Sequence, residues 1–151
     1  MARTSVHALV PIERAFAAVA DPRTYPEWLV GAKRIRDVDD GWPEPGTRFH
    51  HRVGLVGPLT LPDSSTVIEV DAPNRLVLEV RARPLLRGRV TYELARTDGS
   101  DGRPATRISM DERPLGRLRF VAPLLEPLIR GRNRASLNAL VAFLNRPADG
   151  R

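Results

Sequence analysis

The sequence predicts an α+β protein in which an antiparallel β-sheet is covered on one face by a long C-terminal helix. Near the N-terminus, a short alternating segment runs directly into a helical pattern. The middle of the chain alternates apolar and polar residues in several segments separated by Gly, Pro and Asp. The last quarter places apolar residues at helical spacing, which provides the cover that a half-apolar sheet requires.

The N-terminal part is predicted to form a strand, a helix and a second, short helix. Residues 3–10 alternate and are partly β-branched, which favours a strand. Pro11 suits the first helical position, because its missing N–H loses no hydrogen bond there. Asp21-Pro22 ends this helix, and Tyr25-Pro26-Glu27-Trp28 allows one further short helical turn.

Six further segments are predicted to be extended, because apolar and polar residues alternate within them and turn-forming residues separate them. They comprise residues 33–38, 47–56, 59–70, 75–82, 87–96 and 106–110. In the clearest of them, Leu76, Leu78 and Val80 share one face. A bulge or interruption is expected near Pro62. Together with the first strand, these segments give about seven strands.

The last quarter of the chain is predicted to form one amphipathic helix that packs on the sheet. The line of helical spacing contains Leu118, Val121, Leu125, Leu128, Arg132, Ala135, Ala139 and Phe143. Further apolar residues broaden this side of the helix. Pro123 and Pro127 are expected to kink the helix or delay its start, whereas residues 133–145 contain no helix breaker.

The length and composition are ordinary for one globular domain. The chain has 151 residues, of which 42% are hydrophobic and 28% charged. We expect one domain over residues 1–147 and a frayed tail over 148–151. There is no cysteine, which excludes disulfides and cysteine metal sites. Because the sequence shows neither a signal-peptide pattern nor an apolar run of about 18 residues, the expected location is cytoplasmic.

The composition is basic. The net charge is +6, and every basic residue except Lys33 is an arginine. Acidic residues are interspersed with the arginines, and no basic stripe is combined with stacking aromatics, so nucleic acid is not an expected partner. One arginine cluster is suited to anionic lipid headgroups or an acidic ligand. It comprises Arg87, Arg89, Arg130, Arg132 and Arg134.

Short motifs occur along the chain in an informative order and spacing. They are Pro11-Ile12-Glu13, Phe16, Asp21-Pro22, Tyr25-Pro26-Glu27-Trp28, Gly46-Thr47, Glu69-Val70-Asp71-Ala72-Pro73, Ala105-Thr106-Arg107-Ile108 and the helix with Leu137, Leu140 and Leu144. With the element order, they resemble the SRPBCC group of the START-like (Bet v 1-like) superfamily, which includes polyketide cyclase/dehydrase and lipid-transfer relatives. The resemblance implies a helix-grip fold, in which a curved antiparallel sheet wraps around a long C-terminal helix, with two short helices between the first two strands.

The resemblance also implies a ligand cavity between the sheet and the last helix, because in such folds this helix does not lie flat on the sheet. Such cavities are mostly apolar, with a few polar groups that orient the ligand. The inward residues that fit this description are Phe49, His51, Val53, Leu55, Leu76, Leu78, Val80, Val90, Tyr92, Leu94, Ile108 and Met110, closed by Leu125, Leu128 and Ile129. Ordinary core packing is the alternative for each of them, since a cavity wall and a core use the same residue types.

Three polar residues on this inward side are candidates for chemistry. His51 and Tyr92 need partners when buried, and a ligand can provide one. A histidine side chain ordinarily titrates near neutral pH, so His51 is a candidate to transfer a proton to a substrate within hydrogen-bond reach. Glu112 lies on the side of Ile108 and Met110, where it can pair with His51 or with a surface arginine. No catalytic set of the superfamily can be matched onto the chain.

Other reaction classes lack the residue patterns that they need. The three histidines do not show metal-ligand spacing. The sequence contains neither a Gly-rich phosphate loop nor a Gly-x-Ser-x-Gly nucleophile elbow. We therefore expect no metal and no cofactor, and neither nucleotide chemistry nor serine hydrolysis.

Three functions remain open from the sequence. The leading hypothesis is binding of a hydrophobic small molecule, such as a lipid, polyketide or isoprenoid, for sequestration or transport. The second is a polyketide cyclase/dehydrase-like enzyme that transfers protons through His51 or Tyr92. The third is an arginine-mediated module that contacts an anionic membrane surface or a partner. The sequence is compatible with a monomer or a homodimer.

Overall fold

The computed structural model describes residues 2–30, 32–56, 59–82, 86–99 and 101–146. Within these ranges, the description leaves out the side chains of residues 2, 32–36, 51–56, 59–63, 82, 86, 117, 118 and 122. The expected tail, 148–151, lies outside the described residues.

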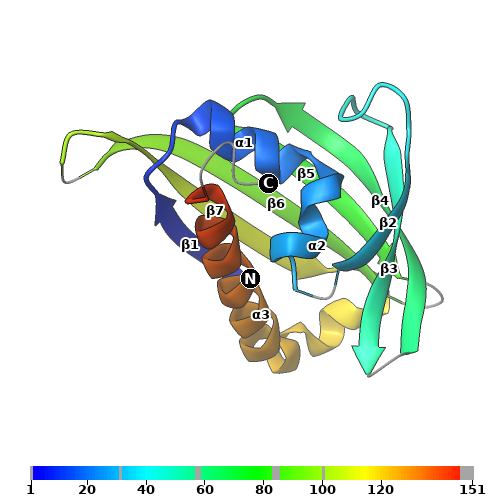
Figure 1. Cartoon of the computed structure of the whole chain (residues 1–151). Coiled ribbons are helices and arrows are strands. Elements are labelled where there is room, and N and C mark those ends of the chain that lie inside the picture. Colours follow the sequence, from blue (N-terminus) through cyan, green and yellow to red (C-terminus); the bar gives the residue numbers. More distant parts are fainter. Residues whose placement is uncertain (1, 31, 57–58, 83–85, 100, 147–151) are drawn as a thin grey trace.

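Seven strands of the described chain form one antiparallel sheet (Figure 1). They are β1 (Ala2–Ala8), β2 (Ala32–Val38), β3 (Arg48–Val56), β4 (Leu59–Asp71), β5 (Arg75–Ala82), β6 (Leu86–Asp98) and β7 (Pro104–Pro114). Their spatial order is β1-β7-β6-β5-β4-β3-β2, so the first and last strands are neighbours. From β2 to β7, each strand pairs with the next one in sequence, as alternating segments with short turns favour. The predicted sheet of about seven strands is confirmed.

The predicted succession of strand, helix and short helix at the N-terminus is also confirmed. α1 (Ile12–Ala20) begins after Pro11, whose carbonyl accepts the backbone N–H groups of Arg14 and Ala15. Asp21 follows α1 and caps the 3₁₀ turn η1 (Pro22–Thr24), because its carboxylate accepts a backbone N–H of that turn at 3.0 Å. α2 (Tyr25–Trp28) follows directly and completes the helical pair between β1 and β2.

The C-terminal helix α3 (Ala122–Leu144) follows the 3₁₀ turn η2 (Gly116–Val121). The expected delay at the prolines does not occur. Pro123 lies in the first turn, where a backbone N–H has no intrahelical partner, so the proline loses no hydrogen bond there. Pro127 lies inside the helix and is exposed, and the helix continues past it without the one hydrogen bond that its missing N–H would make.

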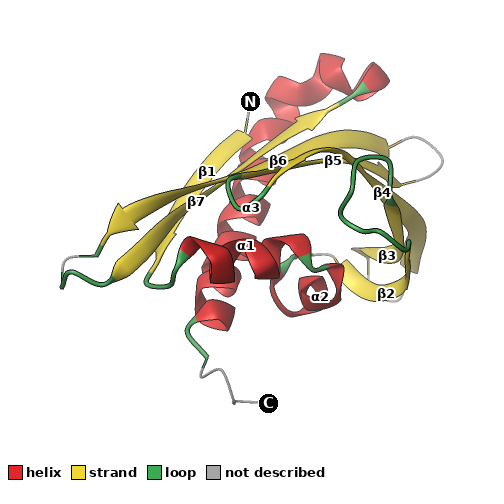
Figure 2. Cartoon of the chain, turned by 90° about the horizontal axis from the view of Figure 1, so that it is seen from above, coloured by secondary structure: helices red, strands yellow, loops and turns green. Residues whose placement is uncertain are grey.

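The end of α3 is fixed to α1 by one arginine. Arg14 Nη2 donates to the backbone oxygens of Leu144 and Arg146, at 2.7 Å and 2.9 Å. These oxygens lie at the C-terminal end of α3, where backbone carbonyls lack intrahelical partners. α3 also packs against β1, β7 and α2. In Figure 2 the sheet curves so that β2 and β3 turn toward α2.

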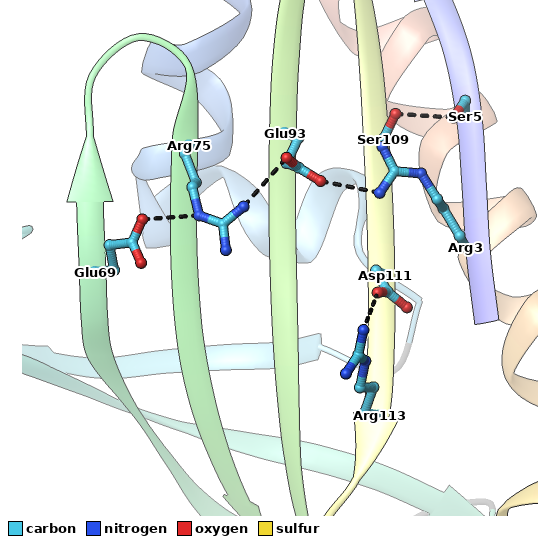
Figure 3. A network of polar contacts seen from close by, with 8 residues as sticks. All are labelled: Arg3, Ser5, Glu69, Arg75, Glu93, Ser109, Asp111 and Arg113. Atoms are coloured by element: carbon cyan, nitrogen blue, oxygen red, sulfur yellow. Dashed lines mark hydrogen bonds and ion pairs between the residues drawn. The ribbon is translucent and has the colours of Figure 1, made fainter. Parts of the chain in front are cut away.

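The outer face of the sheet, away from the helices, is polar. Arg75 contacts Glu69 at 2.8 Å and Glu93 at 3.1 Å, and Arg3 contacts Glu93 at 2.9 Å (Figure 3). This network spans β4, β5, β6 and β1. Because side chains alternate along a strand, the residues between these charged positions face the helices.

The bulge in β4 lies away from the position that the sequence suggested. Pairing of β4 with β3 continues through Pro62, which lies opposite Arg52. The described pairing of β4 with β5 begins at Asp63, opposite Ala82. The register shift lies instead around Ile68, where β4 pairs with β5.

A chain of aromatic rings joins the N-terminal helices to the sheet. Tyr25 lies 5.2 Å from Trp28 and 5.5 Å from Phe49, measured between ring centroids. Trp42 lies 5.0 Å from Phe49, and Trp28 lies 6.2 Å from Tyr92. All four pairs are edge-to-face, an arrangement that stabilises the folded state by more than the buried area of the rings alone. These rings fill the interior at the α1 and α2 end of the molecule.

Candidate functional site

The strand register arranges the helix-facing side of the sheet in rows that run across the strands. The first row contains Phe49, Ser65, Val80, Gly88 and Pro114. The second contains Val67, Leu78, Val90 and Glu112. The third contains Val70, Leu76, Tyr92, Met110 and Thr4. The first row lies beside η2, because the Leu115 N–H donates to the Arg87 carbonyl at 2.9 Å. Each row therefore contains one or two polar side chains among apolar neighbours.

Most of the predicted site residues are brought together in the interior. Eight of them have at most 4% of their surface exposed: Phe49, Leu76, Leu78, Val90, Tyr92, Leu94, Ile108 and Met110. Phe49 and Tyr92 also belong to the aromatic chain, so they have protein partners for their rings. The same set would serve as a core or as the wall of a ligand site.

The remaining predicted residues are placed less deeply or are not described. Val80, Leu125 and Ile129 are half-buried. Leu128 is 73% exposed and does not close the interior. Three further residues belong to β3 by their backbone, but their side chains lie outside the described part of the structure: His51, Val53 and Leu55.

Glu112 forms an ion pair across the interior. Arg132 Nη2, from α3, donates to Glu112 Oε1, from β7, at 2.9 Å. The sequence suggested His51 or a surface arginine as the partner, and the structure shows that it is Arg132. This ion pair is a tertiary contact, because it depends on which turn of α3 lies over β7. The ion pair therefore lies at the second row, to which Glu112 belongs, and the Nε of Arg132 has no partner in the described structure.

Burial alters the acid-base properties of two groups near this pair. Burial raises the pKa of the Glu112 carboxyl above its usual value, and the Arg132 guanidinium only partly opposes this shift. Burial also raises the pKa of the Tyr92 hydroxyl, and the negative charge of Glu112 adds to the shift. Tyr92 therefore keeps its proton at neutral pH and can act as a hydrogen-bond donor.

Two buried polar residues of α3 were missed by the sequence analysis. Asn133 and Ser136 are both fully buried. The Ser136 hydroxyl accepts the Val30 backbone N–H at 3.0 Å. Neither polar atom of the Asn133 side chain has a partner in the described part of the chain. A signal was available, because Asn133 follows Ile129 by four residues and precedes Leu137 by four, which puts a polar residue in an apolar line.

The inward line of α3 differs from the predicted one by a rotation of the helix. The buried apolar residues of α3 are Leu137, Leu140 and Leu144, which the sequence placed among the residues that broaden the apolar side, whereas Leu128 and Ala135 of the predicted line are exposed. Both lines have helical spacing, so spacing alone could not decide between them. Packing of α3 on β1 and β7 selects the inward line.

Burial decreases along α3 toward its N-terminus. Leu137 and Leu140 are fully buried, whereas Leu125 and Ile129 are half-buried. Leu124 is 82% exposed. The protein's own side chains thus cover the C-terminal half of this apolar helix much more completely than the N-terminal half.

Exposed apolar side chains gather on η2 and the first turns of α3. Phe120 is exposed, as are Val121, Leu124 and Leu128. The guanidinium of Arg119 lies over the Phe120 ring, 5.0 Å from its centroid. An apolar group rimmed by a cation is typical of a surface that contacts a partner or a membrane.

The predicted arginine cluster is largely paired with acids. Arg87 contacts Glu79, and Arg130 contacts Glu126. Arg132 contacts Glu112, as described above. Arg89 and Arg134 are exposed. Three of the five cations are therefore engaged with carboxylates of the protein itself.

The described residues contain no group of three or more His, Cys, Asp or Glu side chains placed to hold a metal ion. Among the helices described, none is long and apolar enough to cross a membrane.

A family model described as polyketide cyclase / dehydrase and lipid transport matches residues 2–144. The chain belongs to this family. The matched range runs from β1 to the last residue of α3, so the family assignment covers the sheet, the helices and the ion pair described above. Membership in the polyketide cyclase/dehydrase and lipid transport family confirms the resemblance read from the short motifs. No curated protein matches the chain by sequence.

Solved structures show that the chain shares the helix-grip fold of Bet v 1-like proteins. A protein from Rhodobacter sphaeroides has a TM-score of 0.70 at 16% identity, over 94% of this chain and 89% of that chain. A protein from Chromobacterium violaceum has a TM-score of 0.67 at 16% identity, over 97% and 100%. Ara h 8.0201 has a TM-score of 0.66 at 14% identity, over 94% and 95%. The predicted fold is confirmed.

Proposed function

We propose that this protein binds a hydrophobic small molecule, such as a lipid, polyketide or isoprenoid, between the sheet and α3, for sequestration or transport. The observation that carries the proposal is the decrease in burial along α3. In its C-terminal half the protein fully covers the apolar residues Leu137 and Leu140, whereas Leu125 and Ile129 nearer the N-terminus are only half-covered. Covering apolar surface is favourable by roughly 25 cal/mol per Å², so these side chains favour an apolar occupant.

The sheet also leaves an apolar side chain incompletely covered at the end that lies beside η2. Val80 belongs to the first row, beside η2, and is half-buried as well. An apolar ligand at this end would meet side chains from both layers, with Glu112 and Tyr92 in the next two rows. The family description, which combines cyclisation with lipid transport, supports a hydrophobic ligand.

Ligand extraction and thermal unfolding test this proposal. Organic extraction of the purified protein, followed by mass spectrometry, is expected to release an apolar molecule. Fatty acids, isoprenoids and aromatic polyketides that bind should raise Tm as their concentration rises. If nothing apolar co-purifies and no compound of these classes raises Tm, the proposal is wrong.

A matched pair of variants locates the site. Ile129→Trp adds bulk at a half-buried position of α3 and should reduce the ligand-dependent rise in Tm by at least half. Leu128→Trp adds the same bulk to the neighbouring exposed position and should leave the rise unchanged. Equal effects of the two variants would place the ligand elsewhere.

A polyketide cyclase/dehydrase-like activity is the second candidate, favoured by the interior carboxyl of Glu112. Burial raises the pKa of this carboxyl, so it holds a proton closer to neutral pH than a surface glutamate does. The Tyr92 hydroxyl lies in the adjacent row and can donate a hydrogen bond to a poly-keto chain.

Turnover of a poly-keto substrate tests this activity. Glu112→Gln and Tyr92→Phe should each lower turnover by about 100-fold, a typical loss for an acid-base group. The ligand-dependent rise in Tm should persist in both variants. His51→Ala tests the remaining candidate in the same assay. Unchanged turnover in all three variants would exclude a catalytic role for these residues.

Contact with an anionic membrane surface is the third candidate, favoured by the exposed Phe120, Leu124 and Leu128. Arg119 is exposed and its guanidinium lies over the Phe120 ring, so the surface combines apolar and positive groups. The protein should co-sediment with phosphatidylglycerol vesicles more than with phosphatidylcholine vesicles, and Phe120→Ser should weaken this binding. Absence of salt-sensitive binding to phosphatidylglycerol would contradict it.

A further inference from the structure

Asn133 is fully buried in the middle of α3, and neither Nδ2 nor Oδ1 of its side chain has a hydrogen-bond partner in the described structure. Rotating the amide to exchange the two atoms would not help, because both are unpartnered. A buried polar group without a partner lowers the stability of the folded state. An apolar residue at this position would avoid that penalty.

Ser136 shows what a structural polar residue looks like on the same helix. It lies one turn further along α3 and is equally buried, but its hydroxyl accepts the Val30 N–H. Ser136 thereby holds the segment after α2 against α3. Asn133 has no comparable task among the described residues, and a bound molecule that displaces the side chains covering its amide would supply the missing hydrogen bonds.

A second unpartnered group lies on the layer that faces α3. Thr4 is buried on β1, and its hydroxyl has no partner among the described residues. Thr4 lies opposite Met110, on the helix-facing side of the sheet, and α3 packs against β1. Both layers of the interior therefore present a neutral polar group that can donate and accept hydrogen bonds.

We infer that Asn133 orients the bound molecule and selects an apolar ligand that carries a neutral oxygen function, a ketone or a hydroxyl, over a pure hydrocarbon. This inference rests on the proposed binding function. The amide Nδ2 donates to a ketone oxygen, and Oδ1 accepts from a hydroxyl. Arg132, the residue before Asn133, pairs with Glu112 through Nη2, and its buried Nε has no partner in the described structure, so it is a further donor for a ligand oxygen.

The arrangement also explains why a polar residue is tolerated in this position. The free protein is less stable than it would be with leucine, and the bound protein recovers the deficit when the ligand supplies the missing hydrogen bonds. Such a site discriminates strongly between oxygenated and hydrocarbon ligands, because a ligand that lacks the oxygen leaves the buried amide unpaired.

Three naphthalenes of the same shape test the inference on the full chain. They are methyl naphthyl ketone, the corresponding alcohol and ethylnaphthalene, with binding measured by fluorescence. The wild type should bind the ketone and the alcohol about tenfold more tightly than the hydrocarbon, as expected for a buried hydrogen bond. Asn133→Leu should remove this preference and bind the hydrocarbon at least as tightly as the wild type. Asn133→Ala, which adds no bulk, should also lose the preference.

Thermal unfolding without ligand gives an independent measurement. Asn133→Leu should raise Tm, because it removes an unpaired buried amide. Ser136→Ala should lower Tm, because it leaves the Val30 N–H without its acceptor, and it should keep the preference for the oxygenated probes. A lower Tm for both Asn133 variants would mean that the amide is satisfied in the free protein, by water or otherwise, and would overturn the inference.

The outcomes separate the two proposals. Equal binding of all three probes by the wild type, or a preference that survives in both Asn133 variants, overturns the role of Asn133 and leaves the binding function intact. Failure of the wild type to bind any of the three probes, together with the absence of an apolar molecule in its extract, overturns the binding function and the inference with it.

Discussion

Arg132 of α3 donates to Glu112 of β7 at 2.9 Å, and this contact joins the middle of the helix to the second row of the sheet. The side chains are 38% and 17% exposed, so most of the pair is shielded from water. A shielded ion pair adds little stability relative to two apolar side chains, but it is costly to break. It fixes the turn of α3 that carries Asn133.

Removal of one partner should therefore destabilise the protein more than removal of both. Glu112→Ala is expected to lower the free energy of unfolding by about 2 kcal/mol, less than for a fully buried pair because more than a third of Arg132 is exposed. The double variant with Arg132→Met should recover part of the loss. Urea unfolding of the four proteins measures this coupling. Additive effects of the two substitutions would show that the pair is not formed in solution.

The raised pKa of Glu112 predicts a specific pH dependence of stability. The folded state holds this proton to a higher pH than the unfolded state, whose carboxyl titrates near the usual 4.5. The stabilising contribution is thus complete below pH 4.5 and is lost as the pH rises through the folded pKa. Relative to Glu112→Gln, wild-type stability should fall as the pH rises above about 4.5. Parallel profiles of the two proteins would contradict this prediction.

Glu79 provides a control with the opposite sign. A hydrogen bond from Arg87 lowers the pKa of the Glu79 carboxyl. The contribution of Glu79 to the stability of the folded state is therefore present above the usual pKa of a glutamate. It is lost as the pH falls through the lower pKa that Glu79 has in the folded state. Relative to Glu79→Gln, wild-type stability should fall on acidification below about pH 4.5. The two difference curves should thus slope in opposite directions.

Truncation of leucines along α3 should follow their burial. Leu140 is fully buried, so Leu140→Ala should cost about 2 to 5 kcal/mol from lost apolar burial and the cavity left behind. Leu128 is 73% exposed, and Leu128→Ala should change stability by less than about 0.5 kcal/mol. Chemical unfolding measures both. A large effect of Leu128→Ala would reveal a contact that covers this side chain in solution.

Glu93 joins Arg3 and Arg75 on the outer face (Figure 3), yet these side chains are 38% to 52% exposed. Exposed ion pairs contribute little, so Glu93→Gln should cost roughly 1 kcal/mol or less at low salt. The loss should shrink further in 1 M NaCl, where charges are screened within about 3 Å. Unfolding at the two salt concentrations checks this. A cost that is independent of salt would point to a packing role.

Local patterns predicted the strands well because alternation is a property of neighbouring residues. β5 has the predicted bounds, and its side chains Leu76 and Leu78 are buried as expected. The bulge at Ile68 was not predictable in this way, because it arises from how β4 pairs with β5. α3 begins earlier than its prolines suggested, because Pro123 lies in the first turn, where it is tolerated.

The candidate site was predictable only in its apolar part. Apolar residues on the inward face of each strand were identified from alternation, whereas the partner of Glu112 was left open between His51 and an arginine, and Asn133 was not identified. Both depend on the rotation of α3 about its axis, and neighbouring residues on a helix differ by about 100° around that axis. A broad apolar side leaves this rotation open.

The sequence by itself determined the order of the elements, the helix-grip family and the apolar character of the interior, because alternation, helical spacing and turn residues act over short distances along the chain. Tertiary structure alone decided that Arg132 pairs with Glu112 and that Asn133 faces the interior without a partner. The physical reason is packing: contacts of α3 with β1 and β7 select one rotation of the helix, and that rotation determines which polar groups are buried.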